Sequence, residues 1–160
     1  MGTSLDPGFY QDFPLLASRP FKVTSPASDR YNCIAYAAGD RHRRWWPHED
    51  HYWPFPLPAQ VTVSTIVEAF HTLFGYERCE RAEPERGIAK IAIFAKPDGE
   101  PTHAAVQMTG GADRWRSKIG KNHDIEHGLR DLEGPLYGRV VILLATAITR
   151  RAKRRVQNRV

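Results

Sequence analysis

The sequence predicts an α+β fold, in which helices near the amino terminus precede an antiparallel sheet of about four strands. Two observations predict this class. Apolar residues over 62–74 recur with the period of an α-helix, whereas the segments after residue 87 are short apolar stretches separated by turn residues, as in strands. A chain of 160 residues, 41% of them hydrophobic, is long enough to bury one core. This composition excludes a fibre, a repeat array and a disordered chain.

The region before residue 40 is expected to form an extended lead-in followed by a short helix. Four prolines interrupt residues 1–27 and disfavour regular structure there. Ser28 or Asp29 is suited to cap a helix over about residues 30–38. This arrangement places Cys33 in the first turn of the helix.

Residues 40–60, which we call the aromatic loop, hold four prolines and five aromatic rings. Prolines at this density exclude regular structure, so we expect a loop pinned by its rings. Its Trp45, Trp46 and Trp53 are expected either to cover the core or to line one wall of a substrate cleft beside the cysteine helix. Residues 62–74 follow with an apolar face at helical spacing and predict an amphipathic helix.

Four later segments are predicted to be strands of an antiparallel meander. Their apolar residues run continuously or alternate, and turn residues separate most of them. The four segments are residues 88–95, 102–108, 114–119 and 137–145. Residues 121–133, before the last strand, are expected to be irregular or briefly helical. Helices followed by such a meander are typical of the α+β class.

The net charge of +5 is concentrated at one end of the chain. Residues 150–160 hold six Lys or Arg and no acidic residue, so the rest of the chain is close to neutral. We therefore expect a lead-in (1–27), one domain (28–149) and a basic tail (150–160). A basic run can bind phosphates, so nucleic-acid association is expected only through the tail. The alternative is a solvated chain end.

The sequence predicts a cytoplasmic protein with free thiols and no membrane segment. Its first residues lack the pattern of a secretory signal, and the longest apolar run, residues 140–145, is far shorter than the roughly 20 residues of a membrane span. Cys33 and Cys79 are too few for a disulfide scaffold. Export by a route that reads no amino-terminal signal is the alternative, and no oligomeric state is assigned.

Cys33 is a candidate nucleophile because of its position at a helix start. The helix dipole and the free N–H groups there favour a thiolate, so we expect a lowered thiol pKa. The same groups can stabilise the oxyanion of a tetrahedral intermediate, and Asn32 can add a further donor. The alternative is a cysteine that only packs in the core, as buried free cysteines usually do.

His103 is the candidate general base for this cysteine. It lies in a predicted strand beside Ala104 and Ala105, whose small side chains leave room around the ring. A cysteine at a helix start and a histidine on a later strand form the arrangement used in Cys–His hydrolysis. The alternative is a structural histidine, which is the usual role of a lone histidine on a strand.

The turn between the second and third predicted strands decides which side chain can orient the His103 ring. A three-residue turn at 110–112 makes Ala105 face Ser117. In this register Ser117 is the favoured partner of the ring. A two-residue turn would bring Lys118 to that face, and a charged lysine cannot accept a hydrogen bond. The alternatives to Ser117 are Gln107 on the same face, and Asp124 and His127 elsewhere.

Two histidine pairs raise the alternative of a metal site. His48 and His51 enclose two acidic residues, and His123 and His127 are four residues apart. Neither pair lies on one of the two helices predicted from capping and periodicity, and no cysteine pair or H-E-x-x-H motif completes a site. The sequence also lacks a phosphate-binding loop and a dinucleotide fingerprint. We therefore expect no metal and no cofactor.

Several motifs in combination resemble an uncharacterised bacterial domain family. They include N-C-I-A-Y-A-A-G (32–39), R-W-W-P (44–47), T-H-A-A-V-Q (102–107) and W-R-S-K-I-G (115–120), and the resemblance spans about residues 30–140. The order of cysteine helix, histidine strand and polar strand is also similar, more remotely, to papain-like cysteine hydrolases. That resemblance implies a papain-like fold with Cys33 as nucleophile, His103 as base and Ser117 or Gln107 as the orienting group. A serine departs from the residues that those enzymes more often use in this last role.

The sequence therefore predicts a thiol hydrolase of the peptidase, amidase or deamidase type. Its substrate would be a peptide or another molecule that carries an amide bond. One alternative is a non-catalytic binding module that recognises a protein or ligand through the aromatic loop. The other is nucleic-acid association through the basic tail.

Overall fold

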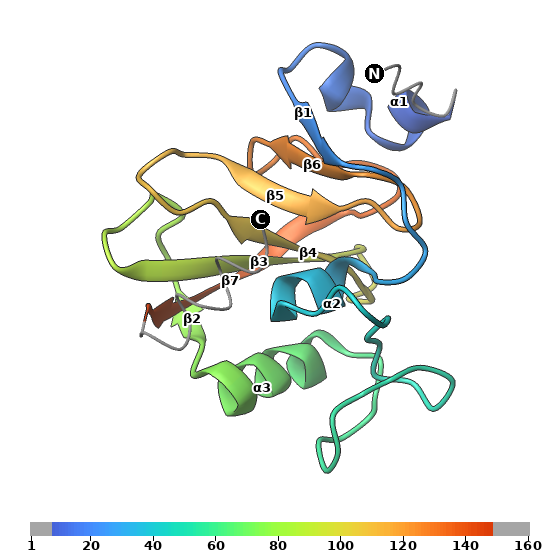
Figure 1. Ribbon diagram of the computed structural model, residues 1–160, viewed down its shortest axis with the longest axis vertical. Coiled ribbons are helices and arrows are strands. Elements are labelled where there is room, and N and C mark those ends of the chain that lie inside the picture. The colour runs from blue at the N-terminus through green and yellow to red at the C-terminus, as the bar shows by residue number, and fades with distance from the viewer. Residues whose placement is uncertain (1–7, 149–160) are drawn as a thin grey trace.

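The computed structural model describes residues 8–148, and one antiparallel sheet organises them (Figure 1). The order of the seven strands across the sheet is β1-β6-β5-β4-β3-β7-β2. The strands are β1 (Lys22–Ser25), β2 (Glu77–Cys79), β3 (Ile88–Ala95), β4 (Pro101–Gln107), β5 (Trp115–Lys118), β6 (Asp124–His127) and β7 (Arg139–Ala147). The helices are α1 (Phe9–Asp12), the 3-10 helix η1 (Pro14–Ala17), α2 (Cys33–Ala38) and α3 (Val63–Phe74).

The predicted fold, a papain-like arrangement of amino-terminal helices followed by a sheet of about four strands, is wrong. The described chain is mostly a seven-stranded antiparallel sheet, and its three α-helices are short. The predicted strands are present as β3, β4, β5 and β7, but β1, β2 and β6 were not predicted. These three have only three or four residues each, so their sequences show no clear alternation. Pairing with distant strands makes them part of the sheet.

The hairpin between β4 and β5 has the register of a three-residue turn. Val106 pairs with Arg116 and Gln107 with Trp115, and the Met108 N–H donates to the Arg114 carbonyl at 2.8 Å. These pairs have the register in which the sequence aligned Ala105 with Ser117, although the paired residues themselves end at Val106 and Arg116. This register places the side chains of alternate residues on β4 and β5 on a common face of the sheet.

The central strands of the sheet are buried on both faces, and β3 contributes to both cores. Its Ile91 and Ile93 pack with α2 and α3 in a cluster that we call the helix-side core. Its Ala92 and Phe94 point the other way and pack in the opposite core with α1, η1 and residues from β5 and β6. A strand buried on both faces explains why residues 88–95 form a continuous apolar run.

A buried lysine fixes the chain at one end of the sheet. The Lys118 ammonium donates to the backbone carbonyls of Ser28, Gly120 and Asn122. These contacts join the segment before α2 to the turn between β5 and β6. Lys118 follows Ser117 on β5, so its side chain points away from the face that holds His103 and Ser117.

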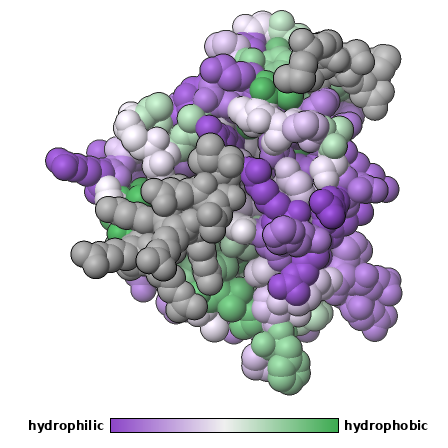
Figure 2. Space-filling model, in the orientation of Figure 1, coloured by the Kyte–Doolittle hydropathy of each residue, from purple (hydrophilic) through white to green (hydrophobic). Residues whose placement is uncertain are grey.

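Hydrophilic residues cover much of the face shown in Figure 2, and a hydrophobic group stands out at its lower edge. The aromatic loop contains the most exposed large apolar side chain among the described residues, Phe55, which is 97% exposed. Among residues 8–148, no helix has the length and apolar character required to cross a bilayer. The basic tail lies outside the described residues, so its association with nucleic acid stays a prediction.

Candidate functional site

Asn32 fixes the start of α2, the helix whose first residue is Cys33. Its side-chain oxygen accepts from the backbone N–H groups of Ala35 and Trp45, each at 3.1 Å. Its side-chain nitrogen donates to the Trp45 carbonyl at 2.7 Å. Asn32 therefore caps the helix and also ties it to the aromatic loop. Its predicted role toward an oxyanion stays a prediction.

The Cys33 thiol is buried, and burial determines its protonation state. The residue is 7% exposed, and loss of hydration raises the pKa of the thiol. The backbone N–H groups of Ala104, Ile34 and Cys33 itself favour the thiolate, but their effect is smaller. The lowered pKa expected from the helix start is therefore wrong, because burial outweighs the helix terminus. The thiol is protonated at neutral pH.

The sulfur lies at a gap between β4 and β5. N–H groups alternate in direction along a strand, and the Met108 N–H bonds to β5, so the Ala104 N–H points toward β5 as well. The paired residues of the two strands end at Val106 and Arg116. The Ala104 N–H is thus directed into the gap, where it is available to the Cys33 sulfur.

His103 lies on the opposite face of the same gap. Its ring packs against Phe94 and Tyr137 of the opposite core, and the residue is 1% exposed. Its Nε2 lies 2.8 Å from the Ser117 hydroxyl, so the two side chains connect β4 with β5. The structure thus brings together His103 and Ser117, the pair that the hairpin register predicted.

A second histidine, His127, also lies within hydrogen-bond distance of the Ser117 hydroxyl. The Ser117 hydroxyl lies 2.7 Å from His127 Nε2, and His127 Nδ1 lies 2.7 Å from the Gly128 carbonyl oxygen. We call His103, Ser117 and His127 the histidine–serine row. Burial lowers the pKa of His127 from 6.5 to about 4. Burial and the neighbouring His127 also lower the pKa of His103 well below 6.5, so both rings are neutral at pH 7.

The histidine–serine row leaves one ring nitrogen of His103 without a hydrogen-bond partner. Nε2 is engaged by Ser117, whereas Nδ1 is buried and makes no hydrogen bond. No hydrogen bond therefore joins the Cys33 sulfur to the imidazole in the resting structure. The two groups approach the gap between β4 and β5 from opposite faces of the sheet.

Tyr137 is a site residue that the sequence did not single out. Its ring stacks on that of His103, with centroids 4.2 Å apart and planes 9° apart. Burial, with a smaller contribution from the nearby Cys33, raises the pKa of its hydroxyl well above the ordinary value. Tyr137 also lines a cavity of about 130 Å³ with Phe9, Phe13 and Ile119 among its walls. The Tyr137 side chain thus contacts the imidazole and also lines a cavity.

The other candidates for the orienting group do not contact the imidazole. The Gln107 amide donates to the Ala82 carbonyl at 2.7 Å, at the far end of β4. Asp124 accepts hydrogen bonds from Ser25 and Tyr31. His127 reaches the imidazole through Ser117.

The three tryptophans proposed for substrate binding lie against the helix-side core. Trp45 is buried there, and Trp46 and Trp53 are half-buried and pack against it. The Trp45 indole donates to Asp40, and the Trp53 indole donates to the Pro58 carbonyl. These contacts agree with the core-covering alternative, and a role in substrate binding stays a prediction.

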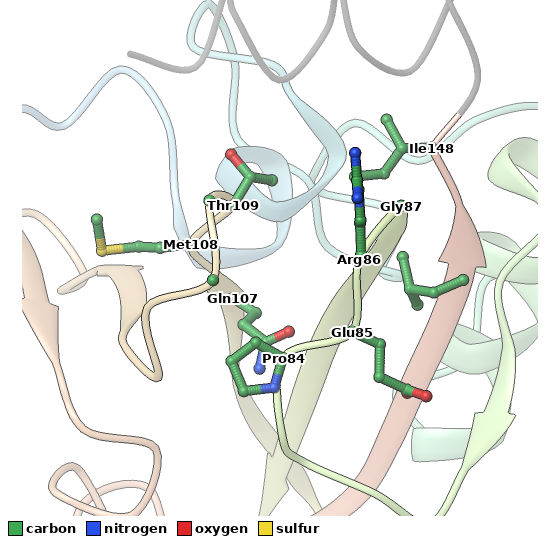
Figure 3. Close-up of a pocket in the computed structure, with 11 residues that line it drawn as sticks. Pro84, Glu85, Arg86, Gly87, Gln107, Met108, Thr109 and Ile148 are labelled. Carbon is green, nitrogen blue, oxygen red and sulfur yellow. The ribbon is translucent and has the colours of Figure 1, made fainter.

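A larger cavity, of about 480 Å³, lies at the other end of β4 from His103. Gln107, Met108 and Thr109 form one wall, and the segment Pro84–Ile88 forms another (Figure 3). Arg86 and Ile148 also line this cavity (Figure 3). Among the described residues, no group of three His, Cys, Asp or Glu side chains is placed to hold a metal ion.

The chain matches a protein family described as a domain of unknown function, DUF7689, over residues 22–145. No curated protein and no solved structure matches the chain. The family match agrees with the expected uncharacterised domain family, whereas the papain-like resemblance is not confirmed. The matched region contains every residue of the candidate site: Cys33, His103, Ser117, His127 and Tyr137.

Proposed function

The chain belongs to the DUF7689 family, and we propose that it is a thiol hydrolase that cleaves amide bonds. The observation that carries this proposal is the buried Nδ1 of His103, which makes no hydrogen bond and lies on β4 next to Ala104, whose N–H is directed at the Cys33 sulfur from the other face of the sheet. A buried polar atom without a partner is costly in a folded protein and requires an explanation, of which a catalytic role is one. A nitrogen in this state is suited to accept a proton from a thiol.

Acylation begins with a neutral thiol and a neutral imidazole. The Cys33 sulfur attacks the carbonyl carbon of the amide while its proton passes to His103 Nδ1. The N–H groups of Cys33, Ile34 and Ala104, which surround the sulfur, are also the nearest donors for the developing oxyanion. The carbon–nitrogen bond then breaks, and the imidazolium returns its proton to the leaving amine. The product is a thioester on Cys33.

Deacylation repeats the same proton transfers with water. His103 Nδ1 takes a proton from the attacking water, and the carbon–sulfur bond breaks as the sulfur regains that proton. The substrate would reach the thiol through the cavity beside Tyr137. This route is supported by the position of Tyr137, which lines that cavity and stacks on the imidazole.

The proposal is tested by the rate at which iodoacetamide labels Cys33 in the wild type and in His103→Gln. If His103 removes the thiol proton, the substitution should slow the labelling of Cys33 by about tenfold or more. Peptide mass spectrometry separates Cys33 from Cys79, which is the internal control and should label at the same rate in both proteins.

A purely structural cysteine would give the opposite result. It would react only when the surrounding structure opens, and loss of the His103–Ser117 contact would make opening easier. Faster labelling of Cys33 in His103→Gln, or an unchanged rate, would therefore contradict the proposal.

A further inference from the structure

Hydrogen bonds along the histidine–serine row are donated in one direction, and the Gly128 carbonyl determines that direction. The Gly128 carbonyl oxygen can only accept a hydrogen bond, so His127 Nδ1 must carry the hydrogen. A neutral imidazole carries one ring hydrogen, so His127 Nε2 is bare. His127 Nε2 is therefore the acceptor in its 2.7 Å contact with Ser117.

This direction continues through Ser117 to His103. The Ser117 hydroxyl has one hydrogen, which it donates to His127 Nε2. Its oxygen can then only accept from His103, so His103 Nε2 carries the hydrogen of that ring. His103 is thereby held in the tautomer in which Nδ1 is bare.

Without the acceptor on His127, the direction of hydrogen-bond donation between Ser117 and His103 would no longer be determined. The Ser117 hydroxyl would be free to donate to His103 Nε2, and His103 would then carry its hydrogen on Nδ1. An imidazole in that tautomer cannot accept the thiol proton at Nδ1. The Cys33 thiol would lose its base, although every side chain of the proposed hydrolase would still be present.

We propose that His127 is a positioning residue, which acts through the Ser117 hydroxyl to hold His103 in the tautomer that can accept the Cys33 proton. This inference rests on the proposed hydrolase function. His127 lies on β6, a strand that reaches the site only because β6 pairs with β5, where Ser117 aligns with Ile125. The role of His127 is to determine the tautomer of His103, the proposed base.

The tautomers can be measured directly in the resting wild-type protein. Long-range proton–nitrogen correlation spectra distinguish a bare ring nitrogen from one that carries hydrogen. We expect opposite tautomers in the two rings, with hydrogen on Nε2 in His103 and on Nδ1 in His127. Hydrogen on Nδ1 of His103 in the wild type would overturn the inference without any substitution.

Two matched variants separate positioning from packing. In His127→Gln the carboxamide oxygen reaches the position of Nε2 and can accept from Ser117. In His127→Asn the shorter amide can replace only the Nδ1 donor to Gly128. We expect the glutamine variant to keep hydrogen on His103 Nε2 and the asparagine variant to shift it toward Nδ1.

The labelling rate of Cys33 supplies the functional measurement. It should fall by about tenfold in His127→Asn and stay close to the wild-type rate in His127→Gln. Equal rates in the two variants would contradict a positioning role. The spectra report the tautomers whether or not the thiol reacts, so failure of this inference is distinguishable from failure of the hydrolase proposal.

Discussion

His103 and His127 are two neutral imidazoles sealed in the opposite core, and their burial has a thermodynamic consequence. A charged imidazole loses its hydration there, so burial lowers the pKa of both rings. Ser117 satisfies one nitrogen of each ring, and the Gly128 carbonyl satisfies another. The hydrogen bonds among His103, Ser117 and His127 therefore require both rings to be uncharged.

We predict that the free energy of unfolding decreases as the pH falls from about 6.5 to about 4. The unfolded chain protonates its histidines near pH 6.5, whereas folded His127 protonates only near pH 4, so unfolding takes up protons in this window. One pKa unit corresponds to about 1.4 kcal/mol, so His127 alone accounts for roughly 3 kcal/mol, and His103 acts in the same direction. Urea denaturation at several pH values measures this slope.

The variant His127→Gln shows how much of that slope belongs to one ring. It removes the titrating group, so the slope between pH 6.5 and 4 should become shallower. His51→Gln, at an exposed histidine, is the matched control. A slope that does not change in His127→Gln would mean that His127 is not buried in its neutral form.

At the scale of elements, two helix caps of the same type have different consequences. Thr62 caps α3 by accepting from the Thr65 N–H, and its hydroxyl also lies within hydrogen-bond distance of the Thr65 hydroxyl in that first turn. Asn32 caps α2 and also holds both backbone polar groups of Trp45, so it joins this helix to the aromatic loop. The position of Cys33 depends on this second connection.

We predict that Asn32→Ala destabilises the protein more than Thr62→Ala. Loss of an ordinary cap costs about 1 kcal/mol, which is the expectation for Thr62. Asn32→Ala also leaves the Trp45 N–H and carbonyl without partners in a buried region, which adds about 1–3 kcal/mol. Urea denaturation compares the two variants under one condition. Equal losses would show that the contacts to Trp45 contribute nothing.

The sequence predicted the elements whose signals are local. Both predicted helices are present as α2 and α3, although the cap of α2 is Asn32 and not Ser28 or Asp29. The long apolar runs became β3 and β7, and the β4–β5 hairpin has the register of the three-residue turn. β6 could not be predicted, because its four residues become a strand only by pairing with β5 and β1. For the same reason the sequence offered His127 only as an alternative partner of the imidazole and did not predict its contact with Ser117.

At the scale of the whole molecule, the sheet brings together segments that are distant in the sequence. Cys33 comes from a helix on one face, whereas His103 and Tyr137 meet on the other. The approach of the sulfur to the Ala104 N–H depends on where the pairing of β4 with β5 ends. No sequence pattern indicates where the pairing of β4 with β5 ends. No pattern indicates the burial of Cys33 that raises the pKa of its thiol either.

The central claim is that these segments form one acylating site, and the reaction with p-nitrophenyl acetate tests it most directly. We expect a burst of about one p-nitrophenolate per protein chain, with an acetyl group on Cys33 detected by peptide mass spectrometry. The burst should be absent in Cys33→Ser and in His103→Gln and should persist in Cys79→Ser. No burst in the folded wild type, or acetylation of Cys79 and surface lysines with none on Cys33, would contradict the account.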